Sequence, residues 1–182
     1  MSPSGTDSVR FDPARLSLQD ALDLAILMED EACQRYQEFT KQVGAGRYPG
    51  DAAEMFRNMS SAEAKHRSQL QERRRALFGS SPSRLTADML DDVEAPDRSS
   101  PRVFMSARQA MEVALRAEEK AHDFFADAVK RVEDPQVRKL FEELRGEEEQ
   151  HAVYVRQILQ RLPPGPDVEE DEADDPGSDP GN

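Results

Sequence analysis

The 182-residue chain contains one cysteine and no tryptophan, and aromatic residues make up 6% of it. A single cysteine excludes a disulfide framework and any zinc or iron–sulfur module built from several cysteines. We expect this residue, Cys33, to be a small buried core side chain. Few aromatics and a charged fraction of 34% favour helices or disorder over a β-sandwich. The composition therefore favours a chain of helices and disordered segments.

Basic residues are in the minority, with 24 Lys and Arg against 37 Asp and Glu and a net charge of −13. This balance argues against nucleic acid as a partner, because phosphate binding needs a positive surface. The most apolar stretch, Leu22 to Met28, is short and contains Asp23, so we expect no membrane span. The first ten residues have no apolar core and predict no signal peptide. We therefore expect a cytoplasmic location.

The acidic charge is concentrated near the C-terminus. Residues 163–182 contain eight acidic residues, no basic residue, five Pro and three Gly. Such a segment has little to bury and predicts a disordered acidic tail. The tail holds −8 of the net charge and leaves −5 for residues 1–162. We expect residues 1–16 to be flexible as well, so the predicted folded domain covers residues 17–162.

Start signals and an apolar period of about 3.6 residues predict four helices. The first and third links between helices are short, which favours two antiparallel hairpins. The second link, about residues 79–105, is long and rich in Pro and Ser. This pattern predicts a four-helix bundle of two hairpins joined by a long crossover. The predicted helices cover residues 17–44, 51–78, 106–132 and 135–162.

Three of the predicted helices begin at recognisable capping residues. Ser17 followed by Asp20, and Ser106 followed by Gln109, match the capping box or a close relative of it. Pro135 suits the first turn of a helix, where its missing N–H has no cost. These signals support the predicted helix starts.

The two predicted hairpins resemble each other in sequence. A shift of 89 residues aligns the first helix with the third, and a shift of 85 aligns the second with the fourth. Chance explains one such match between helical segments, but not two with charged residues in register. The aligned pairs are Ala25/Ala114, Glu29/Glu118, Ala32/Ala121, Tyr36/Phe125, Phe56/Phe141, Met59/Leu144, Glu63/Glu148 and His66/His151.

Each predicted helix has an apolar stripe that is interrupted near its middle. The first and third stripes contain one Glu there, and the second and fourth contain Glu-x-x-His. Antiparallel packing brings the middles of the four helices to one level, so these residues should meet inside the bundle. They are Glu29, Glu63, His66, Glu118, Glu148 and His151.

Four carboxylates of one sign cannot stay ionised in a core without a partner. No stripe supplies a Lys or Arg at that level. Two divalent cations would balance four Glu charges, and neutral His would add nitrogen ligands. Alanines 25, 32, 114 and 121 lie one turn from Glu29 and Glu118 and leave room for ions and a small molecule. The sequence therefore predicts a two-metal site.

One Glu from each of two helices and Glu-x-x-His from the other two is the pattern of ferritin-like di-iron and di-manganese proteins. Residues 17–160 resemble the rubrerythrin-like branch of the ferritin-like superfamily. The motifs that carry this resemblance are AILMEDEACQRY, AEAKH, ALRAEEKAHDFF and EEEQH. The resemblance implies a ferritin-like bundle, two iron ions with manganese as an alternative metal, and a homodimer. It also implies bridging roles for Glu63 and Glu148, terminal roles for Glu29 and Glu118, and one His on each metal.

Two departures from full rubrerythrins are visible. A rubredoxin domain needs four cysteine ligands, and the chain has one cysteine. Rubrerythrins also carry a further Glu on the third helix, one turn past its first Glu ligand, where this sequence has Ala121. The resemblance is therefore to a bundle with the six common ligands and without a rubredoxin domain.

The leading hypothesis is a non-haem di-iron protein that oxidises Fe(II) with O₂ or H₂O₂, in iron homeostasis or oxidative-stress protection. Such a protein is a ferroxidase or a peroxide-reducing oxidoreductase, with an electron donor that the sequence does not identify. His and carboxylate ligands suit iron or manganese. The alternative is a metal-binding, scaffold or iron-storage bundle without turnover.

Two further side chains near the predicted site, His122 and Tyr36, have more than one interpretation. His122 lies four residues after Glu118, and is either a boundary residue facing a neighbouring helix, an extra ligand, or a hydrogen-bond partner of a ligand. Tyr36 is on a core stripe, where aromatic residues usually pack, but its hydroxyl can also hydrogen-bond a ligand or relay an electron. Glu147 is expected to be a solvated residue.

Overall fold

The computed structural model describes residues 13–43, 52–86 and 107–162, and within these residues it contains helices and no strand. The predicted all-α fold is confirmed. None of the described helices is long and apolar enough to cross a membrane. A 3₁₀ turn, η1 (Pro13–Arg15), precedes the long helices α1 (Leu18–Val43), α2 (Ala52–Phe78), α4 (Ala107–Arg131) and α5 (Pro135–Leu159).

Two of the predicted helix starts are visible in the structure. The Asp20 amide donates to Ser17 Oγ at 3.1 Å, and the Ser17 amide donates to the Asp20 carboxylate at 3.4 Å, so a reciprocal cap opens α1. The Asp134 carboxylate accepts hydrogen bonds from the two amides that follow Pro135, at 2.7 and 3.2 Å. The predicted cap at Ser106 lies outside the described residues.

The last helix is shorter than predicted. It ends at Leu159 instead of Leu162, and a turn occupies residues 160–162. The Arg108 guanidinium of α4 donates to the carbonyl groups of Leu159 and Leu162, both at 2.8 Å. These bonds satisfy carbonyl groups that the end of a helix leaves without intrahelical partners.

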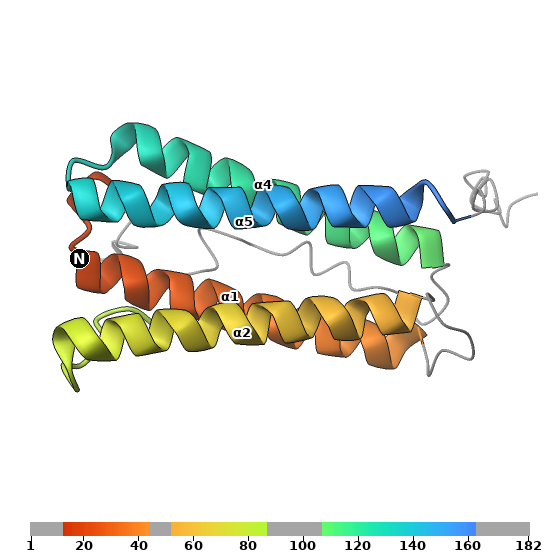
Figure 1. The fold of residues 1–182 in the computed structure, drawn as a ribbon, viewed down its shortest axis with the longest axis horizontal. Helices are drawn as coiled ribbons and strands as arrows, with labels where there is room; N and C mark the ends of the chain where they lie inside the picture. The colour runs from red at the N-terminus through yellow and green to blue at the C-terminus, as the bar shows by residue number, and fades with distance from the viewer. Residues whose placement is uncertain (1–12, 44–51, 87–106, 163–182) are drawn as a thin grey trace, which may run out of the picture.

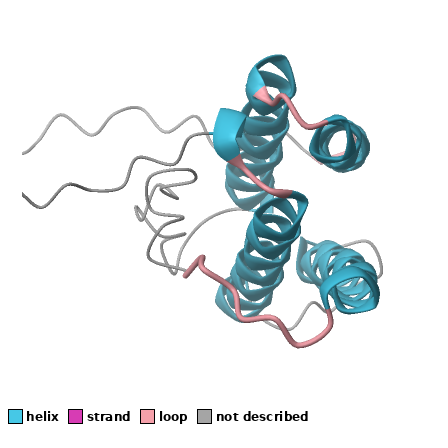
Figure 2. Cartoon of the chain, turned by 90° about the vertical axis from the view of Figure 1, so that its left-hand side faces the viewer, coloured by secondary structure: helices cyan, strands magenta, loops and turns pink. Residues whose placement is uncertain are grey.

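The helices form two antiparallel hairpins, as predicted. Figure 1 shows α1 beside α2 and α4 beside α5, with α4 beginning at the end of the bundle opposite to the end of α2. Figure 2, which looks along the helices, shows the two pairs arranged around a common centre. Residues 87–106 of the predicted crossover, the start of the N-terminal segment (1–12) and the acidic tail (163–182) lie outside the described residues.

The apolar core is divided into two clusters, one at each end of the bundle. In every helix, the buried carboxylate lies between residues of one cluster and residues of the other. The first cluster includes Leu22, Leu70, Phe125, Phe141 and Leu144, and the second includes Tyr36, Phe39, Phe56, Met59 and Met111. The polar residues are therefore enclosed along the bundle axis by side chains that exclude water.

The predicted heptad stripe of α2 is wrong at its C-terminal end. Continued from Glu63 and Leu70, the heptad predicts Arg73 and Leu77 inside the bundle, but Leu77 is 54% exposed. A strict heptad drifts by about 20° per repeat relative to a straight α-helix, so the stripe moves off the core after three repeats. From Leu70 onward, the inward positions are therefore Arg74 and Phe78 instead of Arg73 and Leu77.

Arg74 of α2 forms a largely buried ion pair with Asp23 of α1, between the two helices of the first hairpin. Its Nε and Nη2 atoms donate to the Asp23 carboxylate at 2.7 and 3.3 Å, and Asp23 is 6% exposed. The same guanidinium donates to the carbonyl groups of Gly79 at 3.2 Å and Ser81 at 2.5 Å. The pair therefore fixes the turn after α2 as well as the contact between α1 and α2.

Candidate metal centre

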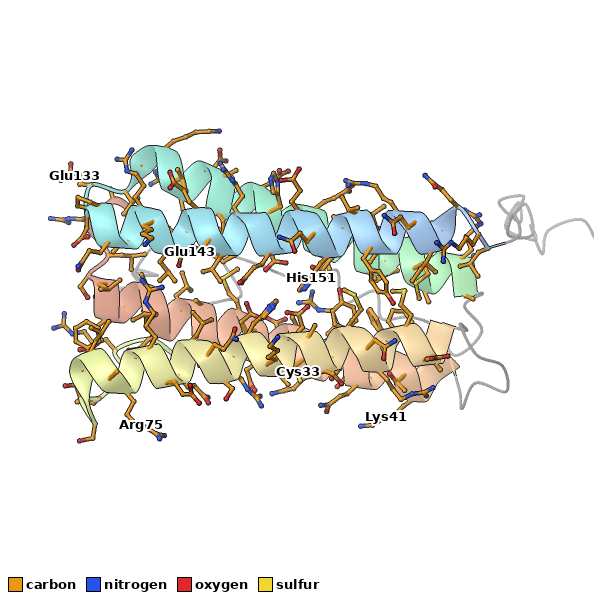
Figure 3. The ribbon with its side chains drawn as sticks, viewed as in Figure 1. Cys33, Lys41, Arg75, Glu133, Glu143 and His151 are labelled. Atoms are coloured by element: carbon orange, nitrogen blue, oxygen red, sulfur yellow. The ribbon has the colours of Figure 1, made fainter. Side chains whose placement is uncertain are left out.

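The structure brings the six residues expected from the stripes together in the middle of the bundle. The four carboxylates are buried, with exposures from 2% at Glu63 to 8% at Glu148. The His66 and His151 side chains are 18% and 13% exposed. The labelled His151 lies midway along the bundle, between the two hairpins (Figure 3). Each helix contributes its residues from its central turns.

The two imidazoles lie side by side, each among carboxylates. The rings of His66 and His151 are stacked, with centroids 5.3 Å apart and an interplanar angle of 6°. His151 Nδ1 is 3.1 Å from Glu63 Oε1, 3.3 Å from Glu118 Oε2 and 3.7 Å from Glu148 Oε2. His66 Nδ1 is 3.9 Å from Glu29 Oε2 and from Glu63 Oε2. Glu63 is thus close to both histidines.

Burial changes the proton affinities of the cluster. Desolvation, with the neighbouring Glu63 carboxyl, raises the pKa of Glu29 to about 11. Desolvation also raises the pKa of Glu148 well above 4.5, although a hydrogen bond with His151 opposes this shift. For Glu63, burial is outweighed by hydrogen bonds with His151 and Glu29, so its pKa is lowered. Without metal, protons therefore reduce the negative charge of the cluster.

The pKa of His151 is raised above its ordinary value of 6.5. Burial works in the opposite direction, but hydrogen bonds with Glu118, Glu148 and Glu63 outweigh it. In the metal-free protein the imidazolium is thus the cationic partner of these carboxylates. A metal ion would have to displace this proton, because only the neutral ring offers a lone pair.

The donor atoms of the cluster fit metal ions. Glu29 Oε2 and His66 Nδ1 are buried and have no hydrogen-bond partner among the described residues. Buried polar atoms are normally paired, so these two atoms are ready for a cation. The described residues contain three groups able to hold an ion: Glu63, His66 and His151; Glu118, Glu148 and His151; and Glu29, His66 and Glu147. Oxygen and imidazole ligands suit iron and manganese.

The sequence of the chain matches the Rubrerythrin family model over residues 20–159, with a second match over residues 109–176. The chain belongs to the rubrerythrin family. A solved structure, described as an uncharacterised conserved protein from Magnetospirillum magnetotacticum MS-1, has the same fold with a TM-score of 0.68 and 24% identity. That match covers 82% of this chain and 98% of the other. A comparison with curated proteins gives no match.

Tyr36 has a polar partner in this rubrerythrin-family bundle. Its side chain is fully buried, and its hydroxyl donates a hydrogen bond to Glu118 Oε1. The ring packs against Phe56 and Phe39, with centroids 5.9 and 6.1 Å away. Tyr36 therefore has both of the roles considered for a hydroxyl on a core stripe: packing and a hydrogen bond to an expected ligand.

His122 and Cys33 are equivalent in the repeat, and neither belongs to any of the three candidate groups. His122 is 33% exposed in its side chain, and its Nδ1 lies 3.1 Å from Asp123 Oδ1. This partial exposure fits a boundary residue, and the Asp123 contact lies on the same helix instead of a neighbouring one. Cys33 is 3% exposed and its Sγ lies 3.4 Å from Ser60 Oγ, which confirms a small buried core residue.

Two residues near the carboxylates were not expected from the sequence. Glu147 was expected to be solvated, but its Oε2 lies 3.9 Å from His66 Nδ1 while its side chain stays 38% exposed. Arg35 is 16% exposed in its side chain and pairs with Glu31 Oε1 at 3.1 Å. Both residues lie off the apolar stripes, so heptad positions alone do not identify them.

A small cavity adjoins the carboxylates between α1 and α4. Its volume is about 20 Å³, close to the space that one water molecule needs. Ala121 contributes a methyl group to the cavity wall, at the position where full rubrerythrins carry a further Glu. The lining residues are Met28, Glu29, Ala32, Arg35, Ala117, Glu118, Ala121 and Glu148.

Proposed function

We propose that this chain holds two iron ions in its buried carboxylate–histidine cluster and oxidises Fe(II) with O₂ or H₂O₂. The observation that carries the proposal is the cluster itself, in which four buried Glu and two His converge between two apolar regions. Two of its metal-donor atoms, Glu29 Oε2 and His66 Nδ1, have no hydrogen-bond partner among the described residues. Membership of the rubrerythrin family supports iron as the metal.

The residues divide into two metal positions that share Glu63. Glu29 and His66 would hold one ion, and Glu118, Glu148 and His151 would hold the other. Glu63 lies near both histidines and is the best placed carboxylate to bridge the two ions. Glu148, the second bridge that the resemblance implies, lies near His151 and is therefore assigned to that ion. Two ferrous ions at these positions would supply the two electrons that one peroxide molecule accepts.

The protein environment would control what reaches the ions. The Tyr36 hydroxyl fixes the orientation of Glu118, and the apolar clusters keep water from both ends of the site. The cavity of about 20 Å³ beside Glu29 and Glu118 has the space for about one water molecule and is too small for an organic substrate. The site geometry therefore supports a small oxidant.

The test measures Fe(II) binding without oxygen and then the reaction with each oxidant. We expect about two Fe(II) per chain and rapid consumption of O₂ or H₂O₂ in stopped flow. Glu63→Gln keeps the volume of the side chain but removes the shared carboxylate, so it should abolish the reaction. Glu72→Gln, on the exposed face of the same helix, is the matched control. Turnover by the Glu63→Gln protein, or metal binding without any oxidant consumption by the wild type, would contradict the proposal.

The proposal extends to a homodimer that acts in the cytoplasm, in iron homeostasis or oxidative-stress protection. These points are supported by the family resemblance and by the acidic, largely polar composition. Sedimentation of the purified full-length chain tests the dimer, with twice the 20.5 kDa chain mass as the expected result.

A further inference from the structure

The cluster has two halves, one with His66 and Glu29 and one with His151, Glu118 and Glu148. The two halves are not equivalent, although the sequence repeat relates them. The shift of 85 residues that aligns His66 with His151 places Ala62 at the position of Glu147. The shift of 89 residues that aligns Glu29 with Glu118 places Phe125 at the position of Tyr36. The half around His66 therefore has the Glu147 carboxylate nearby, and the half around His151 has the Tyr36 hydroxyl. In each case the equivalent residue of the other half lacks that polar group.

The half around His151 contains only buried carboxylates. Its carboxylates, Glu118 and Glu148, are 4% and 8% exposed. The Tyr36 hydroxyl donates to Glu118, and His151 Nδ1 lies within 3.7 Å of both carboxylates. The carboxylates of this half therefore already have polar partners. The residue equivalent to Glu147 in this half is Ala62, which has no carboxylate.

The half around His66 is open to solvent through Glu147. The ligand atoms of Glu29, His66 and Glu147 lie within 4.8 Å of one another, close enough to surround a single ion. Glu147 is 38% exposed in its side chain, whereas Glu29 is 4% exposed. The group thus extends from the buried core to the surface of the bundle.

A second observation points to a ligand at this group. Glu29 Oε2 and His66 Nδ1 are buried and have no hydrogen-bond partner among the described residues. Phe125, which replaces tyrosine at the repeat position, has no hydroxyl to donate to a carboxylate. The buried atoms face the carboxylate of Glu147 across the distance that a bound cation would occupy.

We propose that Glu147 is a third carboxylate ligand of the ion on the His66 side and transfers this ion between solvent and the buried site. The inference rests on the two-metal centre proposed above. An exposed carboxylate can exchange its protein-bound ion with water, while buried ligands cannot reach solvent without local opening. The His66-side ion is therefore the exchangeable one, and the His151-side ion is retained.

The experiment titrates the metal-free full-length protein with Co²⁺, a divalent ion that O₂ does not readily oxidise under these conditions, and follows heat and visible absorption. The wild type should bind two ions. Glu147→Gln should bind one ion with unchanged affinity and the second at least about tenfold more weakly. Glu149→Gln removes the same charge from an exposed neighbouring position and should behave as the wild type. Circular dichroism should be the same for all three proteins.

Two results would overturn the role of Glu147. One is a Glu147→Gln protein that binds both ions with wild-type affinities. The other is equal weakening of both ions, since a ligand of one position cannot act equally on two. A wild-type protein that binds fewer than two ions would instead contradict the proposed two-metal centre, whatever the variants do.

Discussion

Among individual side chains, Tyr36 shows how one hydroxyl breaks the symmetry of a repeated site. It donates to the buried Glu118, and its repeat equivalent is Phe125. A buried acceptor that loses its donor costs more than the net value of one hydrogen bond, because the acceptor stays desolvated. The hydroxyl is therefore expected to stabilise the metal-free bundle as well as to orient a ligand.

Tyr36→Phe should lower the free energy of unfolding of the metal-free protein by about 1–3 kcal/mol, the usual cost of an unsatisfied buried group. Urea unfolding followed by circular dichroism measures the change. Tyr154→Phe removes the same hydroxyl from a tyrosine that is 39% exposed, and should change stability little. Equal effects of the two substitutions would show that the Glu118 contact has no energetic weight.

The four Glu and two His of the cluster could be predicted from the sequence because they occupy heptad positions and recur in two hairpins. Glu147 and Arg35 could not, because each lies about 100° around its helix from the stripe. Their long side chains reach back toward the cluster, and side-chain reach is not visible in a heptad pattern. The Tyr36–Glu118 hydrogen bond was one of several interpretations, and only the packing of α1 against α4 selects it.

Among the helices, the C-terminal half of α2 departs most from its predicted pattern. The heptad stripe placed Arg73 and Leu77 inside, whereas the structure turns Arg74 inward onto Asp23. Arg73 instead pairs with Glu143 Oε2 of α5 at 3.0 Å, near the surface. A sequence of three consecutive arginines does not indicate which of them is buried.

Arg74→Ala should destabilise the protein by about 3 kcal/mol, because it leaves the buried Asp23 carboxylate without a cation. Thermal or urea unfolding of the metal-free protein measures the loss. Arg75→Ala, at an exposed position one residue on, is the control and should cost little. A loss below about 0.5 kcal/mol for Arg74→Ala, the range of an ordinary surface change, would contradict a structural role for this pair.

Gly146 lies inside α5, two residues before Glu148. A Cβ added at this position meets no other atom within 4 Å, so the glycine is not needed for close approach. Gly146→Ala should therefore stabilise the helix by about 0.5–1 kcal/mol through reduced backbone entropy of the unfolded chain. Unfolding measurements test the gain, and a loss of stability or of metal binding would contradict it.

For the bundle as a whole, the helix backbones lie closer together within each hairpin than between the hairpins. The fold class and the pairing of helices followed from loop lengths and helix periods. The division of the core into two apolar clusters around a polar centre also follows from the position of each Glu within its stripe. Helix ends and the drift of the α2 stripe did not follow, because they depend on local hydrogen bonds and on real helix geometry.

The metal-free bundle should lose stability as the pH rises from 5 to 8. The pKa values of Glu29, Glu148 and His151 are raised above their unfolded values, so the folded state binds more protons in this range. A group whose pKa is raised on folding stabilises the folded state most at pH values below its unfolded pKa. This contribution to stability is lost as the pH rises toward its folded pKa. The lowered pKa of Glu63 acts mainly below pH 5 and adds no opposing slope.

Melting temperatures of the metal-free protein at several pH values between 5 and 8 measure this slope. Glu29→Gln removes one of the three titrations and should flatten it. Added Co²⁺ should raise the melting temperature more at pH 7.5 than at pH 5.5, because metal must displace the protons. A metal-free melting temperature that rises with pH, or a metal effect that shrinks with pH, would contradict this charge balance.

The central claim is that two metal ions occupy the middle of this bundle, held by the four Glu and two His. Anomalous diffraction at the iron edge, from crystals of iron-loaded protein, tests it most directly. We predict two peaks in each chain, about 3.5–4 Å apart, between Glu29 and Glu118 and on either side of Glu63. No peak at this position, or a single peak outside the cluster, would contradict the claim.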